Sequence, residues 1–268
     1  MSAPTYQTLT VERRGAAEWL TLARPDRLNA VDATMREELH DYLDRLAGRE
    51  DIRVLVIGGA GRGFCAGLDL RDEVATTPVE PAQAYQLLFW QQRFSQLVVK
   101  LRRIPQVVVA LVNGPAAGLG FSLALAADIR IATTSAVFSA AFIKVGFSGG
   151  DCGSSFHLPR IVGGAAAREL LLTGRPCPAD RALRLGLVSE VVAADELETA
   201  GRKLVDDLLA TSPTGLRLTK DLLNVSESGG GLEAVIAMED RNQMYCLLGG
   251  DPVEGIRAFQ EKRAPRFQ

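Results

Sequence analysis

The chain has 268 residues and 47% of them are hydrophobic, which is enough to bury a sizeable core in one large domain or two small ones. Its formal net charge is −2, so no strong overall field favours nucleic acid or an acidic membrane surface as a partner. The four cysteines are widely spaced and form no Cys-x-x-Cys pair, which disfavours zinc sites and disulfide frameworks. Such cysteine usage is typical of the reducing cytoplasm.

The first residues of the chain and its apolar stretches indicate a soluble protein. The first ten residues lack the basic and apolar regions of a signal peptide. Polar residues interrupt every apolar stretch before it reaches the roughly 20 residues that a membrane span requires. We therefore expect a cytoplasmic location and no membrane partner.

The N-terminal part predicts two strands followed by a helix. Residues 7–23 predict two short strands around a turn at 13–16, and a loop over 24–30 follows because Pro25 breaks the strand. Asp32 is a typical N-cap residue for a helix over 33–47. Five apolar positions fall on one face of that helix: Met35, Leu39, Tyr42, Leu43 and Leu46.

Strands and helices alternate up to about residue 194, and only helices follow. We expect strands at 53–58, 107–112, 129–133 and 187–192, with a short strand and turn over 136–147. Helices are expected at 82–103, 117–127, 151–161, 164–172 and 179–185. Later helices are expected at 195–211, 213–225, 231–248 and 252–263. The pattern therefore predicts an α/β body, residues 1–194, and an all-helical C-terminal region, residues 195–268.

Two glycine-bearing loops, each preceded by an apolar strand, are the main functional signal. The first covers residues 64–70 and the second covers residues 113–120, which open a helix-like run. Backbone N–H groups at a helix start have no intrahelical partner and point outward. Two such loops that face each other could hold one developing negative oxygen between two N–H groups. This arrangement suits an enolate formed from a thioester.

Three other patterns are weaker. The glycines of residues 58–63 do not open directly into a helix, which disfavours a dinucleotide-binding loop. Residues 146–150 match Gly-x-Ser-x-Gly, but only Asp151 lies between them and His157, a spacing too short for a hydrolase triad. His40 and His157 are the two histidines of the chain, which excludes a His-based metal cluster. We expect His40 to face solvent and His157 to pack within its helix.

Asp151 has two interpretations that the sequence leaves open. It follows two glycines and precedes a helix start, where aspartate is a good N-cap. Alternatively, its carboxylate shuttles a proton in a partly apolar pocket. Phe142, Phe147 and Phe156 could supply the apolar walls of that pocket.

Several blocks in the same order resemble the crotonase (enoyl-CoA hydratase/isomerase) superfamily nearly from end to end. The blocks are residues 24–32, 64–70, 113–120, 126–130, 158–163, 172–175 and 259–263. The resemblance implies a crotonase-type ββα superhelical spiral with a helical C-terminal trimerisation region. It implies homotrimers, often paired as hexamers. It also implies an acyl-CoA thioester as substrate, with coenzyme A entering as part of that substrate and no separate cofactor or metal.

The resemblance also assigns expected roles to individual residues. Leu68 and Leu119 would donate the two oxyanion N–H groups from their backbones. Five residues would lie near the coenzyme A moiety: Arg24, Leu28, Ala66, Gly67 and Asp69. Phe259 and Lys262 would approach its adenine end, across a subunit boundary. The polar segment 74–82, which contains Pro78 and Pro81, predicts a mobile loop that borders the acyl pocket.

The mechanism implied by the resemblance departs from that of the hydratases. Hydratases of this superfamily use two glutamates on one water, and this chain has Ser122 and Phe142 at those positions. Asp151 falls where members that isomerise double bonds or attack aromatic thioesters carry an aspartate. The resemblance therefore implies an enzyme that isomerises enoyl-CoA, with Asp151 as the proton shuttle. A hydratase that uses Asp151 alone and a non-catalytic acyl-CoA-binding protein remain alternatives, whereas no basic stripe supports RNA binding.

Overall fold

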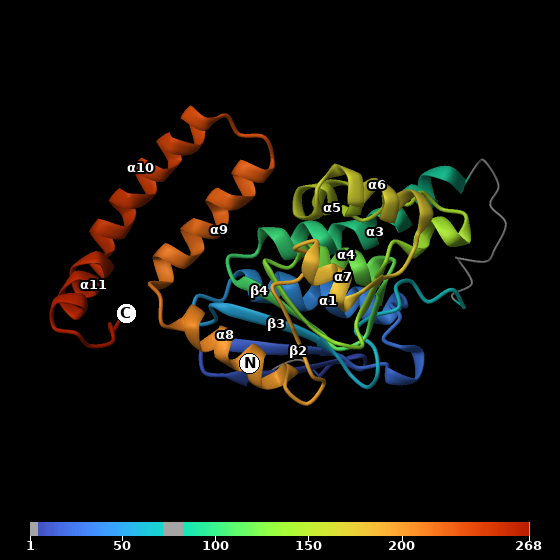
Figure 1. The fold of residues 1–268 in the computed structure, drawn as a ribbon, viewed down its shortest axis with the longest axis horizontal. Helices are drawn as coiled ribbons and strands as arrows, with labels where there is room; N and C mark the ends of the chain where they lie inside the picture. Colours follow the sequence, from blue (N-terminus) through green and yellow to red (C-terminus); the bar gives the residue numbers. More distant parts are fainter. Residues whose placement is uncertain (1–4, 72–82, 268) are drawn as a thin grey trace.

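A six-stranded sheet forms the centre of the body (Figure 1). The computed structural model describes residues 5–71 and 83–267, so the predicted loop at 74–82 lies outside the described residues. The strands, in their spatial order, are β1 (Leu9–Arg14), β2 (Ala17–Leu22), β3 (Val54–Gly59), β4 (Val107–Val112), β6 (Ile129–Thr133) and β9 (Glu190–Val192). The first two pair antiparallel, and all later neighbours are parallel. The predicted bounds of β4 and β6 are confirmed.

A smaller sheet lies beside the main one and was not fully predicted. It contains β5 (Pro115–Ala117), β7 (Val137–Ser139) and β8 (Cys177–Pro178) in that order. The sequence indicated a short strand within 136–147 but gave no sign of β5 or β8. Each of these contains a proline and has three residues or fewer, so neither can show an alternating pattern.

Helices cover both faces of the main sheet, and alternate residues of each strand serve the two faces. On one face, Leu55 and Ile57 of β3 join the large core with α1 (Ala33–Ala47), α3 (Ala84–Arg103) and α4 (Leu119–Ala126). On the other face, Val54 and Val56 pack with α8 (Leu197–Leu209), which lies below the sheet in Figure 1. This period of two is what a sheet buried on both sides requires.

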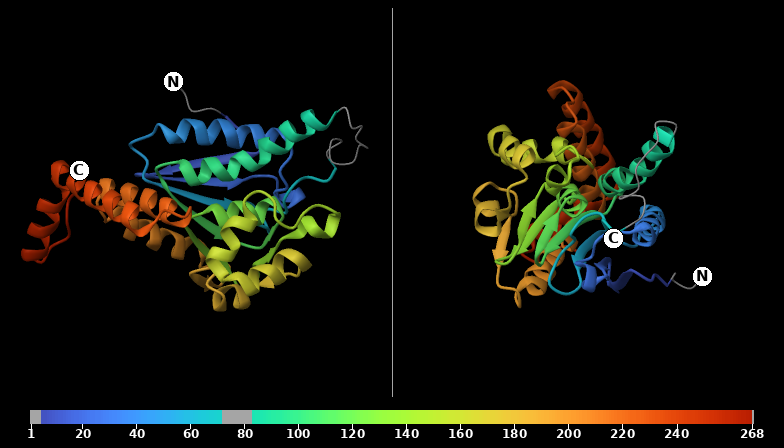
Figure 2. Two further views of the ribbon diagram at one scale, coloured as in Figure 1. Left: turned by 90° about the horizontal axis from the view of Figure 1, so that it is seen from above. Right: turned by 90° about the vertical axis from the view of Figure 1, so that its right-hand side faces the viewer.

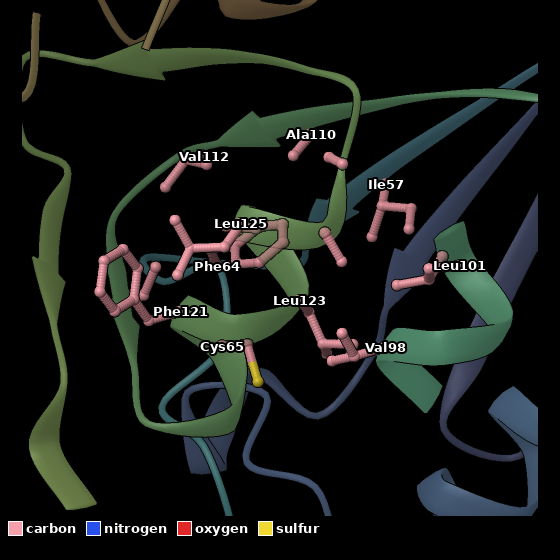
Figure 3. Packing of buried hydrophobic residues seen from close by; sticks show 14 of the residues in the cluster. Ile57, Phe64, Cys65, Val98, Leu101, Ala110, Val112, Phe121, Leu123 and Leu125 are labelled. Atoms are coloured by element: carbon pink, nitrogen blue, oxygen red, sulfur yellow. The ribbon is translucent and has the colours of Figure 1, made fainter. Parts of the chain in front are cut away.

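Helix α4 is buried along its whole length, in keeping with its almost entirely apolar sequence. Leu123 of α4 points toward Val98 of α3, and Phe121 lies on another side of the same helix (Figure 3). Because α4 begins at Leu119, this packing fixes the helix start that follows the second glycine-bearing loop.

Helix α1 begins and ends where the sequence predicts. Asp32 caps it, since its Oδ1 accepts a hydrogen bond from the N–H of Met35 at 2.8 Å, and Gly48 ends it. The predicted apolar face is buried. The expectation that His40 faces solvent is wrong, because α3 covers this side of α1 and His40 Nε2 lies 2.7 Å from the carbonyl oxygen of Arg93. Burial lowers the pKa of His40.

Three further helices and two short 3₁₀ segments complete the body. Their bounds are α5 (Ser154–Val162), α6 (Gly164–Thr173), α7 (Ala179–Arg184), η1 (Pro25–Arg27) and η3 (Ala141–Val145). Helix α5 packs between α4 and α6, and His157 is buried within it, as expected. The loop between η3 and α5 contains Asp151.

The last three helices extend away from the body as an arm (Figures 1 and 2). They are α9 (Pro213–Glu227), α10 (Leu232–Gly249) and α11 (Asp251–Gln260), so the all-helical character of this region is confirmed. Many large apolar side chains of the arm are exposed: Leu223, Leu232, Ile236, Met244, Tyr245, Leu247, Leu248, Val253, Ile256 and Phe259. Within residues 5–71 and 83–267, no helix has the length and apolar composition needed to cross a membrane.

Candidate active site

The two glycine-bearing loops lie directly against each other. Cys65 and Ala116 form a parallel bridge between them. The N–H of Cys65 donates to the carbonyl oxygen of Pro115 at 3.1 Å, and the N–H of Ala117 donates to the carbonyl oxygen of Cys65 at 2.9 Å. Because both loops follow parallel neighbours, β3 and β4, they meet at the same edge of the sheet.

Glycine is required where the loops touch. A Cβ atom on Gly67 would lie 2.8 Å from the carbonyl oxygen of Ala117 and 3.3 Å from the amide nitrogen of Leu119. Gly67 also has φ +98°, a conformation that other residues rarely adopt. A Cβ atom on Gly120 would lie 2.1 Å from the carbonyl oxygen of Cys65. The small residues therefore let the first loop approach the N-terminus of α4.

The amides of Leu68 and Leu119 both belong to residues that line one pocket. Leu119 is the first residue of α4, so its N–H has no partner inside the helix. On either side of Leu68, the carbonyl oxygen of Gly67 and the N–H of Asp69 bond to the backbone of Val31. This pairing turns the Leu68 N–H away from Val31. Among the described residues, no protein acceptor receives either N–H group.

The pocket beside these amides is a narrow cavity of about 90 Å³ with mostly apolar walls. Besides Leu68 and Leu119, its larger apolar side chains are Leu70, Trp90, Phe94, Phe142, Val145 and Phe147. Among the described residues that line it, Asp151 is the one carboxylate. Phe142 and Phe147 thus form part of the wall, as expected.

Phe156 does not belong to this pocket, so the expectation for it is wrong. It lies one turn into α5 and borders a separate groove with Arg102 and His157. The guanidinium of Arg160 lies 3.7 Å from the centre of its ring. The direction of α5 places the Phe156 side chain in this groove, and the sequence pattern did not reveal that direction.

Several hydrogen bonds hold Asp151. Its Oδ1 accepts from Gln91 Nε2 at 2.8 Å and from the N–H of Cys152 at 2.6 Å. Its carbonyl oxygen accepts from the N–H of Ser154 at 3.0 Å and from Ser122 Oγ at 3.2 Å. The loop is therefore fixed at its backbone, and the carboxylate is turned toward Gln91.

The N-cap interpretation of Asp151 is wrong. The chain is left-handed at Cys152 and Gly153, with φ of +46° and +78°, so α5 begins at Ser154 and its N-cap is Gly153. The Asp151 side chain is thereby released from capping and lines the pocket. Burial and, to a smaller extent, the Asp151 carboxylate raise the pKa of the Cys152 thiol, which stays protonated.

Neither Ser122 nor Phe142 places a carboxylate in the pocket. Ser122 is fully buried on α4, and its Oγ donates to the carbonyl oxygen of Asp151. The Phe142 ring lies beside Gly118, where an added Cβ would be 3.5 Å from Phe142 Cε1. The expected positions of two hydratase glutamates are thus occupied by a buried hydroxyl and an aromatic wall.

The structure brings the residues expected near coenzyme A together at the edge of the pocket. The Arg24 guanidinium lies 3.0 Å from carboxylate oxygens of both Asp32 and Asp69. The N–H of Ala66 donates to the carbonyl oxygen of Leu28 at 2.9 Å. Ala66 also lines the pocket. These contacts hold Arg24 against Asp69 and Leu28 against Ala66, beside the first glycine-bearing loop.

Phe259 and Lys262 lie far from these residues within one chain. Phe259 is on α11, the last helix of the arm, and its side chain is 85% exposed. Lys262 follows two residues after that helix ends. Their expected contact with coenzyme A thus needs a neighbouring subunit and stays a prediction.

The sequence reasoning missed Trp90, Gln91, Phe94 and Cys152, all of which line the pocket. One signal could have revealed Gln91. It lies three residues before Phe94 and seven before Val98, both buried on the inner face of α3. A polar residue at an otherwise apolar helical position is unusual and is a reason to look for a partner.

The described part of the chain contains no group of three histidine, cysteine, aspartate or glutamate side chains that could hold a metal ion.

Comparison with known proteins places this arrangement in a family. The family model described as enoyl-CoA hydratase/isomerase matches residues 12–268. A 1,2-epoxyphenylacetyl-CoA isomerase from Escherichia coli is 39% identical over 92% of this chain and 93% of its own length. A probable enoyl-CoA hydratase from Mycobacterium bovis is 37% identical over 92% of this chain and 88% of its own length.

The fold agrees with solved structures of the same family. The crystal structure of a probable enoyl-CoA hydratase/isomerase from Mycobacterium abscessus matches with a TM-score of 0.89 and 34% identity. The match covers 98% of this chain and 99% of that one. The expected α/β fold with a helical C-terminal region is confirmed, and the chain belongs to the enoyl-CoA hydratase/isomerase (crotonase) superfamily of acyl-CoA enzymes.

Proposed function

We propose that this enzyme isomerises the double bond of an enoyl-CoA thioester and that Asp151 is its proton shuttle. The observation that carries the proposal is the single carboxylate of Asp151 in an apolar pocket that also presents the residues of two unpaired amides, Leu68 and Leu119. A base and two N–H donors in one pocket are the groups that enolate chemistry requires.

The proposed reaction moves one proton between two carbons. Asp151 removes a proton from the carbon next to the thioester carbonyl of a 3-enoyl-CoA, and the electron pair passes to the carbonyl oxygen. The resulting dienolate oxygen is held by the N–H groups of Leu68 and Leu119. Asp151 then returns the proton to the fourth carbon, which regenerates the carboxylate. The product is the 2-enoyl-CoA, whose double bond joins the second and third carbons.

The oxyanion donors and the base each contribute to the proposed rate enhancement. One oxyanion donor is commonly worth about 3 kcal/mol of transition-state stabilisation. A positioned general base contributes about 10²–10⁴-fold. Because Leu68 and Leu119 act through their backbones, their leucine side chains are compatible with this role.

The walls of the pocket favour a flat, unsaturated acyl group. Trp90, Phe94, Phe142 and Phe147 supply aromatic faces and edges around the carboxylate. The Escherichia coli relative is named for an isomerase of 1,2-epoxyphenylacetyl-CoA. We therefore propose that cyclic or aromatic acyl thioesters belong to the substrate range beside short enoyl groups.

Hydration by Asp151 alone is a second candidate function. The Mycobacterium bovis relative is named a probable enoyl-CoA hydratase, and one carboxylate can activate a water. The positions of Ser122 and Phe142 count against it, since neither can orient that water as a second carboxylate would. A non-catalytic acyl-CoA-binding protein would have no base beside the acyl group.

One set of assays separates these functions. The enzyme and its Asp151→Asn variant are supplied with 3-enoyl-CoA and 2-enoyl-CoA, and conjugation, hydration and exchange of the acyl Cα protons with D₂O are followed. We expect the wild type to isomerise and exchange, and the variant to lose about 10²–10⁴-fold in both. An active Asp151→Asn variant would remove Asp151 from the mechanism, and a wild type without exchange would indicate a binding protein.

We also propose that the arm formed by α9, α10 and α11 joins subunits into a trimer or a hexamer in the cytoplasm. Its exposed apolar side chains support this, because such a patch is unusual on a monomer. Light scattering on the purified full chain measures the subunit number, and a monomer at all concentrations would contradict the proposal.

A further inference from the structure

The two carboxylate oxygens of Asp151 differ in their surroundings. Two N–H groups from different parts of the chain donate to Oδ1, one from Gln91 at 2.8 Å and one from Cys152 at 2.6 Å. No described N–H group donates to Oδ2. The arrangement therefore anchors Oδ1, and no described N–H group competes with a substrate proton for Oδ2. The Cys152 thiol is a further neighbour of the carboxylate.

Gln91 is itself firmly placed. It lies on α3 one turn before Phe94, which is buried in the main core. The ring of Phe94 packs edge-on against Trp90, with 4.8 Å between the ring centres. Because helix position and ring packing both fix this turn of α3, the Gln91 amide meets Asp151 from a constant direction.

We propose that Gln91 is a positioning residue that orients the Asp151 carboxylate for proton transfer. This inference rests on the proposed function. The last torsion of an aspartate side chain is broad, so the neighbouring N–H of Cys152 alone restricts it weakly. A second donor, Gln91, from another helix defines the carboxylate plane and directs Oδ2 toward the acyl group.

The same two hydrogen bonds serve both halves of the reaction. When Oδ2 is ionised, Oδ1 accepts both N–H groups. When Oδ2 carries the proton, Oδ1 is the carbonyl oxygen of the acid and still accepts them. The carboxyl group thus keeps one orientation while it takes a proton from one carbon and returns it to another.

The test replaces Gln91 by two side chains of similar length. Gln91→Met removes the donor and adds no charge. Gln91→Glu also removes the donor at neutral pH, but it restores an O–H donor when acid adds one proton to the pair of facing carboxylates. The matched control is Gln92→Met, because Gln92 is the next residue of α3 and is exposed.

We expect Gln91→Met to lower kcat for isomerisation about 10–100-fold at all pH values, with KM within about twofold. Gln91→Glu should be as slow as Gln91→Met at pH 8 and recover at least part of its kcat as the pH falls toward 5. Gln92→Met should match the wild type. This acid-dependent recovery depends on a hydrogen bond, and a purely structural role for Gln91 would not produce it.

Asp151→Asn is measured beside these variants to separate the two proposals. If Asp151→Asn stays active, the proposed function fails. If Asp151→Asn is inactive while Gln91→Met keeps the wild-type kcat, only the positioning role is overturned. If Gln91→Met is slow and Gln91→Glu stays slow in acid, the hydrogen bond is not the cause, and the role is also overturned. Should Gln91→Met not fold, the pH profile of Gln91→Glu decides.

Discussion

Ser122 Oγ donates a hydrogen bond to the backbone carbonyl oxygen of Asp151 at 3.2 Å. Ser122 is fully buried on α4, and its hydroxyl lies behind the loop rather than in the pocket. Ser122, at the position expected for a hydratase glutamate, therefore supports the backbone of the proposed base. The serine at this position therefore has a structural role, which is to hold the loop that carries Asp151.

Exchange of this serine for glutamate is not expected to create a hydratase. Ser122→Glu would place a carboxylate at a position that is fully buried in the described structure. An unpaired buried charge destabilises the fold by about 3 kcal/mol or more. Urea unfolding and hydration of 2-enoyl-CoA measure the two effects. Ser122→Ala is the control, with a loss of about 1 kcal/mol. Efficient hydration by Ser122→Glu would contradict this interpretation.

The contact between the two glycine-bearing loops predicts a defect in activity at Gly67. A Cβ atom in Gly67→Ala would lie 2.8 Å from the carbonyl oxygen of Ala117 and would force the loops apart. We expect kcat to fall about 10²–10³-fold, as when one oxyanion donor is removed.

The matched control is Gly15→Ala in the turn between β1 and β2. Gly15 also has positive φ, +64°, but an added Cβ meets nothing within 4 Å. This variant should lose about 1 kcal/mol of stability and keep its kcat. Equal kcat losses in both variants would show that backbone strain, rather than the contact between loops, sets the effect.

A buried ion pair fastens the arm to the body. Lys220 Nζ on α9 lies 2.9 Å from Asp128 Oδ2 and donates to the carbonyl oxygen of Gln106 at 2.6 Å. Removing one partner of such a pair costs about 3–5 kcal/mol, so Lys220→Met should lower the free energy of unfolding by about that amount. Urea unfolding measures this change, with Lys203→Met as the control, because Lys203 is an exposed residue of α8. A change below about 1 kcal/mol would show that the pair adds little.

Stability should depend on pH through His157. Burial, followed by Arg102, Arg130 and Arg160, lowers the pKa of His157 to about 4. The unfolded chain binds this proton near pH 6.5 and the folded chain does not, so the contribution of His157 to stability falls as pH drops from 6.5 to 4. The loss approaches about 3 kcal/mol at pH 4.

The variant His157→Gln isolates this effect. Other groups also titrate in this range, so the quantity to compare is the difference in unfolding free energy between the wild type and the variant. We expect this difference to shift in favour of the variant by about 2 kcal/mol between pH 7 and pH 4.5. A difference that stays constant over this range would show that His157 is protonated equally in the folded and unfolded chains.

The local chemistry of the sequence determined most elements of this protein. Asp32 begins α1 and Gly48 ends it, and the apolar runs of β4 and β6 have the predicted bounds. The two glycine-bearing loops were also recognisable, because a strand, a turn rich in glycine and a helix start are features of neighbouring residues. The order of these blocks was sufficient to identify the superfamily.

Only the tertiary structure decided which side chains line the pocket and which hydrogen bonds they form. Gln91 and Asp151 are 60 residues apart and meet because α3 packs over the loop before α5. The burial of His40, the outward turn of Phe156 and the release of Asp151 from capping likewise depend on which helix covers which surface. Hydrophobic periodicity and turn preferences act between near neighbours, whereas hydrogen-bond partners across the fold are chosen by the packing of whole elements.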